Sequence, residues 1–191
     1  MPQLVIGLGN PGGEYARTRH NAGWMGLEEL EKRGRFSRER KDGPALVRTG
    51  DIEGFDVVTA RPSTFMNLSG KAGNHLIAEF GSDPRDVIVM HDDIDLPLGR
   101  IRVRRGGSAA GQKGVKSLMD AWRTPEFIRV RIGVGRPDDK GDVVDYVLDK
   151  FRPDEREALA VVLPWAAAAV VSVIRVGLEA TMTEFNRPIP T

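Results

Sequence analysis

The stretch that decides the fold is Val87-Ile88-Val89-Met90, followed directly by the polar segment His91-Asp92-Asp93-Ile94-Asp95-Leu96-Pro97. An unbroken apolar run rich in β-branched residues is typical of a strand that is buried on both faces of a sheet. Residues at the end of such a strand commonly face the functional crevice of an α/β fold. The stretch therefore predicts an α/β protein in which these aspartates lie near the site.

The rest of the chain alternates short apolar runs with longer stretches of helical periodicity. Strands are predicted at residues 3–9, 45–49, 55–60, 86–91, 101–104 and 127–134. Helices are predicted at 21–32, 64–80 and 114–122, and a last one from about 153 to 183, in which Pro164 should cause a kink near Leu163. We expect one domain, residues 1–191, with a central sheet flanked by helices.

Composition excludes several classes of protein. With 40% hydrophobic and 29% charged residues, the 191-residue chain is too apolar to be disordered. The absence of cysteine excludes disulfides and thiol catalysis and fits a reducing cytoplasm. The apolar stretch 158–174 is shorter than the ~20 residues that span a bilayer, so we expect a buried or amphipathic helix and no membrane segment. The N-terminus predicts a first strand and not a signal peptide.

A local basic stripe contrasts with the net charge of +1. In the alternating run Arg100-Ile101-Arg102-Val103-Arg104-Arg105, a strand would place every second arginine on one face. The small-residue loop that follows leads into a helix, where backbone N–H groups often bind anions. Further charge could come from Lys113, Lys116, Arg129 and Arg131. This pattern favours binding to a polyanion over a merely solvated basic face.

The segment Gly7-Leu8-Gly9-Asn10-Pro11-Gly12 matches the G-x-G-x-x-G pattern of dinucleotide-binding proteins. In those proteins a helix begins within the motif, whereas here apolar periodicity starts only near Asn21. The motif therefore indicates a structural turn, or a loop that presents Asn10 to a ligand, rather than a nicotinamide site.

His20 is a candidate general base, because its pKa near 6.5 suits proton transfer. Three interpretations of the segment 91–95 remain open from the residues alone. One aspartate orients a base, or His91, Asp92, Asp93 and Asp95 bind a divalent metal, or the carboxylates are solvated turn residues. No G-x-S-x-G or P-loop motif is present, which leaves activation of water by His20 as the predicted chemistry.

Five motifs in order make the chain resemble the bacterial-type peptidyl-tRNA hydrolases over nearly its whole length. They are the Gly7–Gly12 segment with Tyr15, Thr18-Arg19-His20-Asn21, Phe65-Met66-Asn67-Leu68-Ser69-Gly70, His91 to Pro97, and the Gly-rich loop. The resemblance implies a mixed β-sheet sandwiched between α-helices and an esterase that splits peptidyl-tRNA and recycles its tRNA. It also implies a cytoplasmic monomer that needs neither metal nor cofactor.

The same resemblance implies roles for particular residues. His20, oriented by Asp92, would activate water, and Asn10 and Asn67 would bind the peptide end, with Asn10 also contacting the histidine. Tyr15 and Met66 would line the cleft. The tRNA would be bound by Arg102, Arg104 and Arg131.

One loop departs from the family pattern Gly-Gly-His-Asn-Gly, because here it reads Ala110-Gly111-Gln112-Lys113-Gly114. Gln112 can still form hydrogen bonds with a substrate, whereas Lys113 gains a charge but loses an acceptor. We expect slower or altered turnover from this change. A noncatalytic RNA-binding protein on the same scaffold is the alternative. The polar segment 136–142 and the amphipathic run 143–151 that follows it predict a mobile surface flap.

Overall fold

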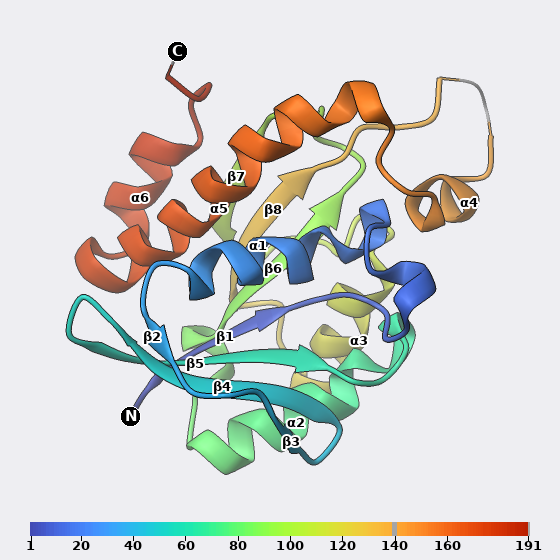
Figure 1. Ribbon diagram of the computed structural model, residues 1–191. Coiled ribbons are helices and arrows are strands. Elements are labelled where there is room, and N and C mark those ends of the chain that lie inside the picture. Colours follow the sequence, from blue (N-terminus) through green and yellow to red (C-terminus); the bar gives the residue numbers. More distant parts are fainter. Residues whose placement is uncertain (139–140, 191) are drawn as a thin grey trace.

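The computed structural model describes residues 1–138 and 141–190, so Asp139 and Lys140 of the predicted flap lie outside the described residues. An eight-stranded mixed sheet runs through its centre (Figure 1) in the order β2-β4-β5-β1-β6-β8-β7, with β3 paired to β4. The strands are β1 (Gln3–Gly7), β2 (Arg35–Phe36), β3 (Arg40–Asp42), β4 (Ala45–Ile52), β5 (Phe55–Pro62), β6 (Ile88–Asp93), β7 (Ile101–Arg105) and β8 (Ile128–Gly133).

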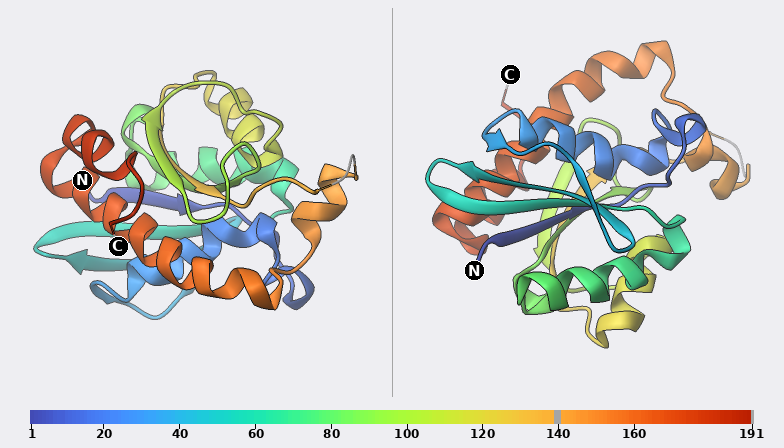
Figure 2. Two further views of the ribbon diagram at one scale, coloured as in Figure 1. Left: turned by 90° about the horizontal axis from the view of Figure 1, so that it is seen from above. Right: turned by 60° about the horizontal axis from the view of Figure 1, so that its bottom comes forward.

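Helices cover both faces of this sheet. They are α1 (Ala22–Glu31), α2 (Ser69–Phe80), α3 (Lys113–Trp122), α4 (Val143–Leu148), α5 (Arg156–Val176) and α6 (Leu178–Phe185). Figure 2 shows α1, α5 and α6 on one side of the sheet and α2 and α3 on the other. Each side encloses its own apolar core. The predicted α/β fold, a mixed β-sheet sandwiched between α-helices, is confirmed.

Strand β6 has the central position that its apolar run predicts. All six of its residues are buried. It runs parallel to β1 and β8, and β1 is also parallel to β5. The carboxyl ends of these four strands therefore lie at one edge of the sheet. Strand β1 lies between β5 and β6, where the strand order changes direction. Such an edge is where α/β sheets form ligand-binding crevices.

The prediction of a single last helix is wrong. A short 3₁₀ turn, η5 (Pro153–Glu155), precedes α5, and the chain breaks at Gly177 (φ 90°) before α6 begins. The break turns α6 back against β7, where the Asn186 side chain bonds both the N–H and the C=O of Val103. That contact covers an otherwise unpaired sheet edge.

Among the described residues, one helical stretch is long and apolar enough to cross a membrane, namely Pro153–Val176, with a mean hydropathy of 2.1. Over half of its apolar window is buried in the protein, and residues such as Val162, Ala166 and Val170 are fully covered. The helix is a buried core element, as its interrupted apolar sequence predicts.

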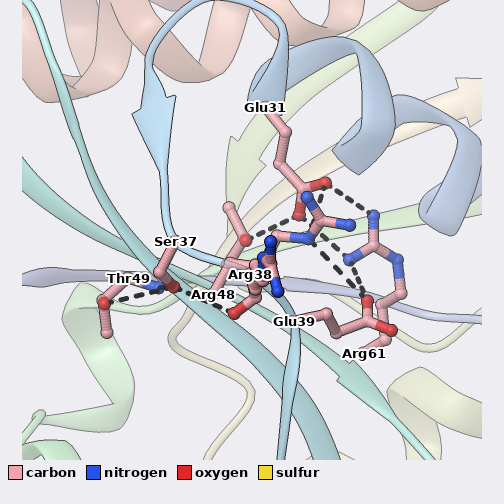
Figure 3. Close-up of polar contacts among 8 residues, drawn as sticks. Glu31, Ser37, Arg38, Glu39, Arg48, Thr49 and Arg61 are labelled. Atoms are coloured by element: carbon pink, nitrogen blue, oxygen red, sulfur yellow. Dashed lines mark hydrogen bonds and ion pairs between the residues drawn. The ribbon is translucent and has the colours of Figure 1, made fainter.

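The short strands β2 and β3 were not predicted, and a polar cluster holds this segment of the chain on the sheet (Figure 3). Glu31, at the end of α1, accepts two hydrogen bonds from Arg61, at 2.9 and 3.0 Å, and one from Thr59. Arg61 also donates to Glu39, in the segment between β2 and β3. The cluster therefore joins α1, β5 and this connecting segment.

Candidate active site

The site lies where the carboxyl ends of β1 and β6 meet the 3₁₀ turn η2 (Arg19–Asn21) just before α1. His20 comes from η2 and Asp92 from β6, and His20 Nδ1 lies 2.9 Å from Asp92 Oδ2. Both residues are buried, with His20 at 9% and Asp92 at 2% exposure. The sequence predicted this pair, and the structure brings its members into contact.

The close approach of α1 to the sheet fixes this geometry. A Cβ added at Gly23 would lie 2.4 Å from the Met90 carbonyl oxygen, and one at Gly7 would lie 2.6 Å from the Gly23 carbonyl oxygen. A Cβ at Gly9 would contact the Trp24 ring. The first two glycines of the G-x-G-x-x-G segment therefore allow helix and strand to touch, which supports the structural-turn interpretation.

The environment of His20 sets its protonation. Burial lowers its pKa, but the charge of Asp92 and the hydrogen bond to it raise the pKa by more, against a smaller lowering from Lys113. The net result is a pKa above the ordinary value of 6.5. In the neutral ring, an ionised Asp92 requires the proton on Nδ1, which leaves Nε2 with a free lone pair.

Gln112 is the second hydrogen-bonding partner of the Asp92 side chain. Its Nε2 donates to Asp92 Oδ1 at 2.9 Å, and its Oε1 accepts from the backbone N–H of Val115 at 2.8 Å, capping α3. Only 8% of the residue is exposed. Sequence reasoning identified Gln112 as a substrate-binding residue, but both ends of its amide already have protein partners. The next residue, Lys113, is exposed at the start of α3.

Asn10 is held from both sides by protein groups. Its backbone N–H and C=O both bond the Asn21 side chain, and its own Oδ1 accepts from the backbone N–H of Met66 at 2.7 Å. No hydrogen bond joins Asn10 to His20 among the described residues, but both line the same cavity. With its oxygen bonded to Met66, Asn10 has its Nδ2 group as the remaining donor. Sequence reasoning missed Asn21, whose only signal was its place next to His20.

A cavity of about 300 Å³ opens beside His20. Its polar wall contains Asn10, His20, Asn67, Asp92 and Lys113. Its apolar wall comes largely from exposed or half-exposed residues of three segments: Phe65, Ile94, Val143, Val144 and Leu148. The residues of α4 were predicted as part of a surface flap and not as site residues. Met66 lines the cavity as expected, whereas Tyr15, in η1 (Gly13–Tyr15), is not among the lining residues.

Arg19 joins α4 to the turn that carries His20. Its guanidinium lies 4.2 Å from the centre of the Tyr146 ring and donates to the Tyr146 carbonyl and to Glu155. Tyr146 in turn donates to the Val134 carbonyl at 2.6 Å. Among the described residues, Arg19 therefore connects α4, which forms part of the apolar wall, to the turn η2 that carries His20.

The four side chains of the possible metal site have other partners in the structure. His91 donates to the Asp92 carbonyl and accepts from Arg129, while Asp93 pairs with Arg131 at 2.6 Å. Asp95 pairs with Arg136 at the surface. Within residues 1–138 and 141–190, no three carboxylate or imidazole side chains converge on one point. The orienting interpretation of the segment is the one that the geometry favours.

The basic stripe is only partly a free surface. Arg102 and Arg104 are exposed on one face of β7, as the alternation predicts. They pair in register with Arg131 and Arg129 of β8. Arg129, however, is 1% exposed, because the loop after β7 folds over it and places the Ser108 carbonyl 2.7 Å from its Nη1. The expectation that Arg129 adds surface charge is wrong.

Comparison with known proteins identifies the scaffold. The family model described as peptidyl-tRNA hydrolase matches residues 4–191. Peptidyl-tRNA hydrolases of Nocardia farcinica and Aquifex aeolicus are each 42% identical to the chain, and each match covers 97% of the chain and 96% of the relative. The crystal structure of peptidyl-tRNA hydrolase from Acinetobacter baumannii superimposes with a TM-score of 0.92 at 32% identity, covering 100% of this chain and 97% of that one.

The match extends over the whole scaffold around the His20–Asp92 pair, including the sheet edge that carries it. The resemblance expected from the sequence motifs is confirmed. The chain belongs to the peptidyl-tRNA hydrolase family.

Proposed function

We propose that this protein hydrolyses the ester bond that joins a peptide to the 3′ ribose of tRNA, with His20 as the general base. The observation that carries the proposal is the buried His20–Asp92 pair, with a 2.9 Å hydrogen bond at Nδ1, which leaves Nε2 free beside a cavity. A neutral imidazole in this position can take a proton from water as the water attacks the ester carbonyl.

Asp92 supports this step in two ways. It holds the ring in the Nδ1–H tautomer, and its charge stabilises the imidazolium that forms when Nε2 takes the proton. The free Nδ2 group of Asn10 and the exposed amide of Asn67 border the same cavity. Amide donors of this kind can stabilise the oxyanion that develops on the carbonyl, an effect whose loss typically costs ~3 kcal/mol.

The substrate has two parts, and the molecule offers a surface for each. The apolar wall of Phe65, Val143 and Leu148 suits peptide side chains, and the exposed Arg102 and Arg104 suit tRNA phosphates. Arg131, whose charge is shared with Asp93, would add a weaker contact. We further propose that the whole chain acts as one catalytic domain and as a monomer, since one chain supplies both members of the His20–Asp92 pair. The absence of cysteine supports the proposal that it works in the reducing cytoplasm.

The test is hydrolysis of a purified N-blocked aminoacyl-tRNA by the wild type and by His20→Ala, each with EDTA present. The matched control is His75→Ala, because His75 also pairs with an aspartate, Asp42, at 2.7 Å but lies on α2, outside the cavity. We expect hydrolysis by the wild type and the control and a loss of about 10²- to 10⁴-fold in His20→Ala. Binding of the tRNA by the wild type without hydrolysis would instead show a noncatalytic RNA-binding protein.

A further inference from the structure

A chain of hydrogen bonds passes through Gln112 and ends on Nδ1 of His20, the ring nitrogen opposite the reactive Nε2. The chain runs from the Val115 backbone N–H to Gln112 Oε1, from Gln112 Nε2 to Asp92 Oδ1, and from Asp92 Oδ2 to His20 Nδ1. Its three lengths are 2.8, 2.9 and 2.9 Å. Gln112, Asp92 and His20 are all buried residues, so water does not compete freely for these bonds.

The first link sets the direction of the second bond in this chain. A backbone N–H can only donate, so the atom of Gln112 that faces Val115 must be the amide oxygen. The amide nitrogen, a donor, must then face Asp92, whose Oδ1 accepts. This bond holds the carboxyl group of Asp92 in place. When Asp92 acts as a carboxylate, its Oδ2 accepts from Nδ1–H of His20, and the lone pair of the neutral ring lies on Nε2.

We propose that Gln112 is a positioning residue for the reaction, which uses the first turn of α3 to hold the Asp92 carboxylate and, through it, the orientation and tautomer of the His20 ring. The inference rests on the proposed function, since it describes how that same site is prepared. No titratable group is needed at position 112. The other charged groups near the pair are accounted for: His91 donates to the Asp92 backbone, Asp93 is paired with Arg131, and Lys113 is exposed.

Three substitutions separate this role from simple capping of α3. Gln112→Ser keeps a good N-cap but is too short to reach Asp92. Gln112→Glu keeps an acceptor for Val115 but turns a second carboxylate oxygen toward Asp92. Gln112→His is the conservative variant, because a neutral imidazole offers one acceptor and one donor on opposite sides of the ring.

We expect kcat to fall on the order of 10- to 100-fold in Gln112→Ser, the scale for a misaligned catalytic group, with KM within about twofold of the wild type. Gln112→Glu falls at least as far, and Gln112→His stays within a few-fold of the wild type. Wild-type kcat in the serine or the glutamate variant would overturn the proposal. The proposal would also be overturned if all three variants had the same fall in kcat, the same change in KM and the same fall in unfolding temperature.

A second readout does not depend on catalysis. The side-chain ¹⁵N shifts of His20 distinguish the two neutral tautomers, and we expect Nδ1–H in the wild type and a mixture in Gln112→Ser. An unchanged tautomer in Gln112→Ser overturns the role of Gln112, even if the protein hydrolyses peptidyl-tRNA. The expected tautomer change in a protein without hydrolysis supports the role of Gln112 while refuting the proposed function.

Discussion

At the scale of single residues, the balance of charges around His20 predicts how the reaction depends on pH. Its pKa is the outcome of burial, which lowers it, and of Asp92, which raises it by more. The base must be neutral, so kcat falls as the pH drops through a pKa above 6.5. In Asp92→Asn, burial and Lys113 remain and both lower the pKa, so the acid limb of the pH profile moves to lower pH.

The plateau of kcat also falls in Asp92→Asn, by about 10²- to 10⁴-fold, because the neutral amide neither selects the Nδ1–H tautomer nor stabilises the imidazolium. The measurement is the pH profile of kcat for both proteins on an N-blocked aminoacyl-tRNA. An acid limb that stays in place in the variant would show that a group other than His20 controls it.

Arg129 is a buried cation whose contacts support the site without lining it. Burial and Arg131 lower its pKa to about 10, so it remains charged at neutral pH. It donates to the carbonyls of Gly106 and Ser108 and to Nε2 of His91. His91 stays neutral because burial lowers its pKa to about 3. One guanidinium therefore fastens the loop before Gln112 to strand β6.

Arg129→Met should destabilise the protein by about 3 kcal/mol, because it leaves several buried acceptors without a donor. For a chain of this size, that loss corresponds to a fall in Tm of roughly 6–12 °C. The control is Arg102→Met on the neighbouring strand, where the exposed side chain should matter by less than ~0.5 kcal/mol. Calorimetry of both variants makes the comparison, and equal Tm values would show that the buried contacts add no stability.

At the scale of secondary-structure elements, the cluster in Figure 3 predicts how α1 and the β2–β3 segment are held. The side chains of Arg61 and Glu31 are 6% and 10% exposed, so removing Glu31 leaves Arg61 poorly solvated, with Glu39 as its remaining partner. Glu31→Leu should therefore cost up to about 3–5 kcal/mol. Glu29→Leu on the same helix breaks only an exposed pair with Lys32 and should cost less than ~1 kcal/mol.

The double variant Glu31→Leu with Arg61→Leu tests the cause of that loss. If the cost comes from a buried arginine that has lost its main partner, removing the arginine as well should restore much of the stability. Urea unfolding curves of the two single variants and the double variant give the three free energies. A double variant as unstable as the sum of the two single ones would contradict this explanation.

The elements that the sequence predicted well are those that packing and propensity specify together. Strand β6 and helices α1 and α3 have strong apolar patterns, and their ends lie within two residues of the predicted ones. Strands β2 and β3 have only two and three residues, mostly polar, and exist through their pairing with β4. The break at Gly177 was readable, since glycine after a basic last turn is a common helix end.

Side-chain burial was harder to predict than secondary structure. Alternation places Arg129 and Arg131 on the same face of β8 as the stripe of β7, and the register confirms that geometry. It contains no information about the loop that later covers Arg129. The pairing of Gln112 with Asp92 was equally hidden, because it depends on how the loop after β7 approaches the end of β6.

At the scale of the whole molecule, a net charge of +1 means that attraction to tRNA must come from a few well-placed cations. Arg102 and Arg104 are exposed on β7, and Lys113 is exposed at the cavity. No ion pair holds any of the three within the described chain, so their charges are available to phosphates. We expect β7 to contact duplex phosphates and Lys113 to contact the single-stranded 3′ end.

The two kinds of contact have different salt signatures. Each lost contact lowers the slope of log affinity against log salt concentration by about 0.9 for duplex and about 0.7 for single strands. Arg102→Gln should therefore reduce the slope for intact tRNA and for an acceptor stem trimmed of its 3′ end. Lys113→Asn should reduce it for intact tRNA alone. Lys32→Gln changes an exposed cation that directly follows α1 and pairs with Glu29, and it should leave both slopes unchanged. If all three variants had the same slopes as the wild type, tRNA would have to approach another face of the molecule.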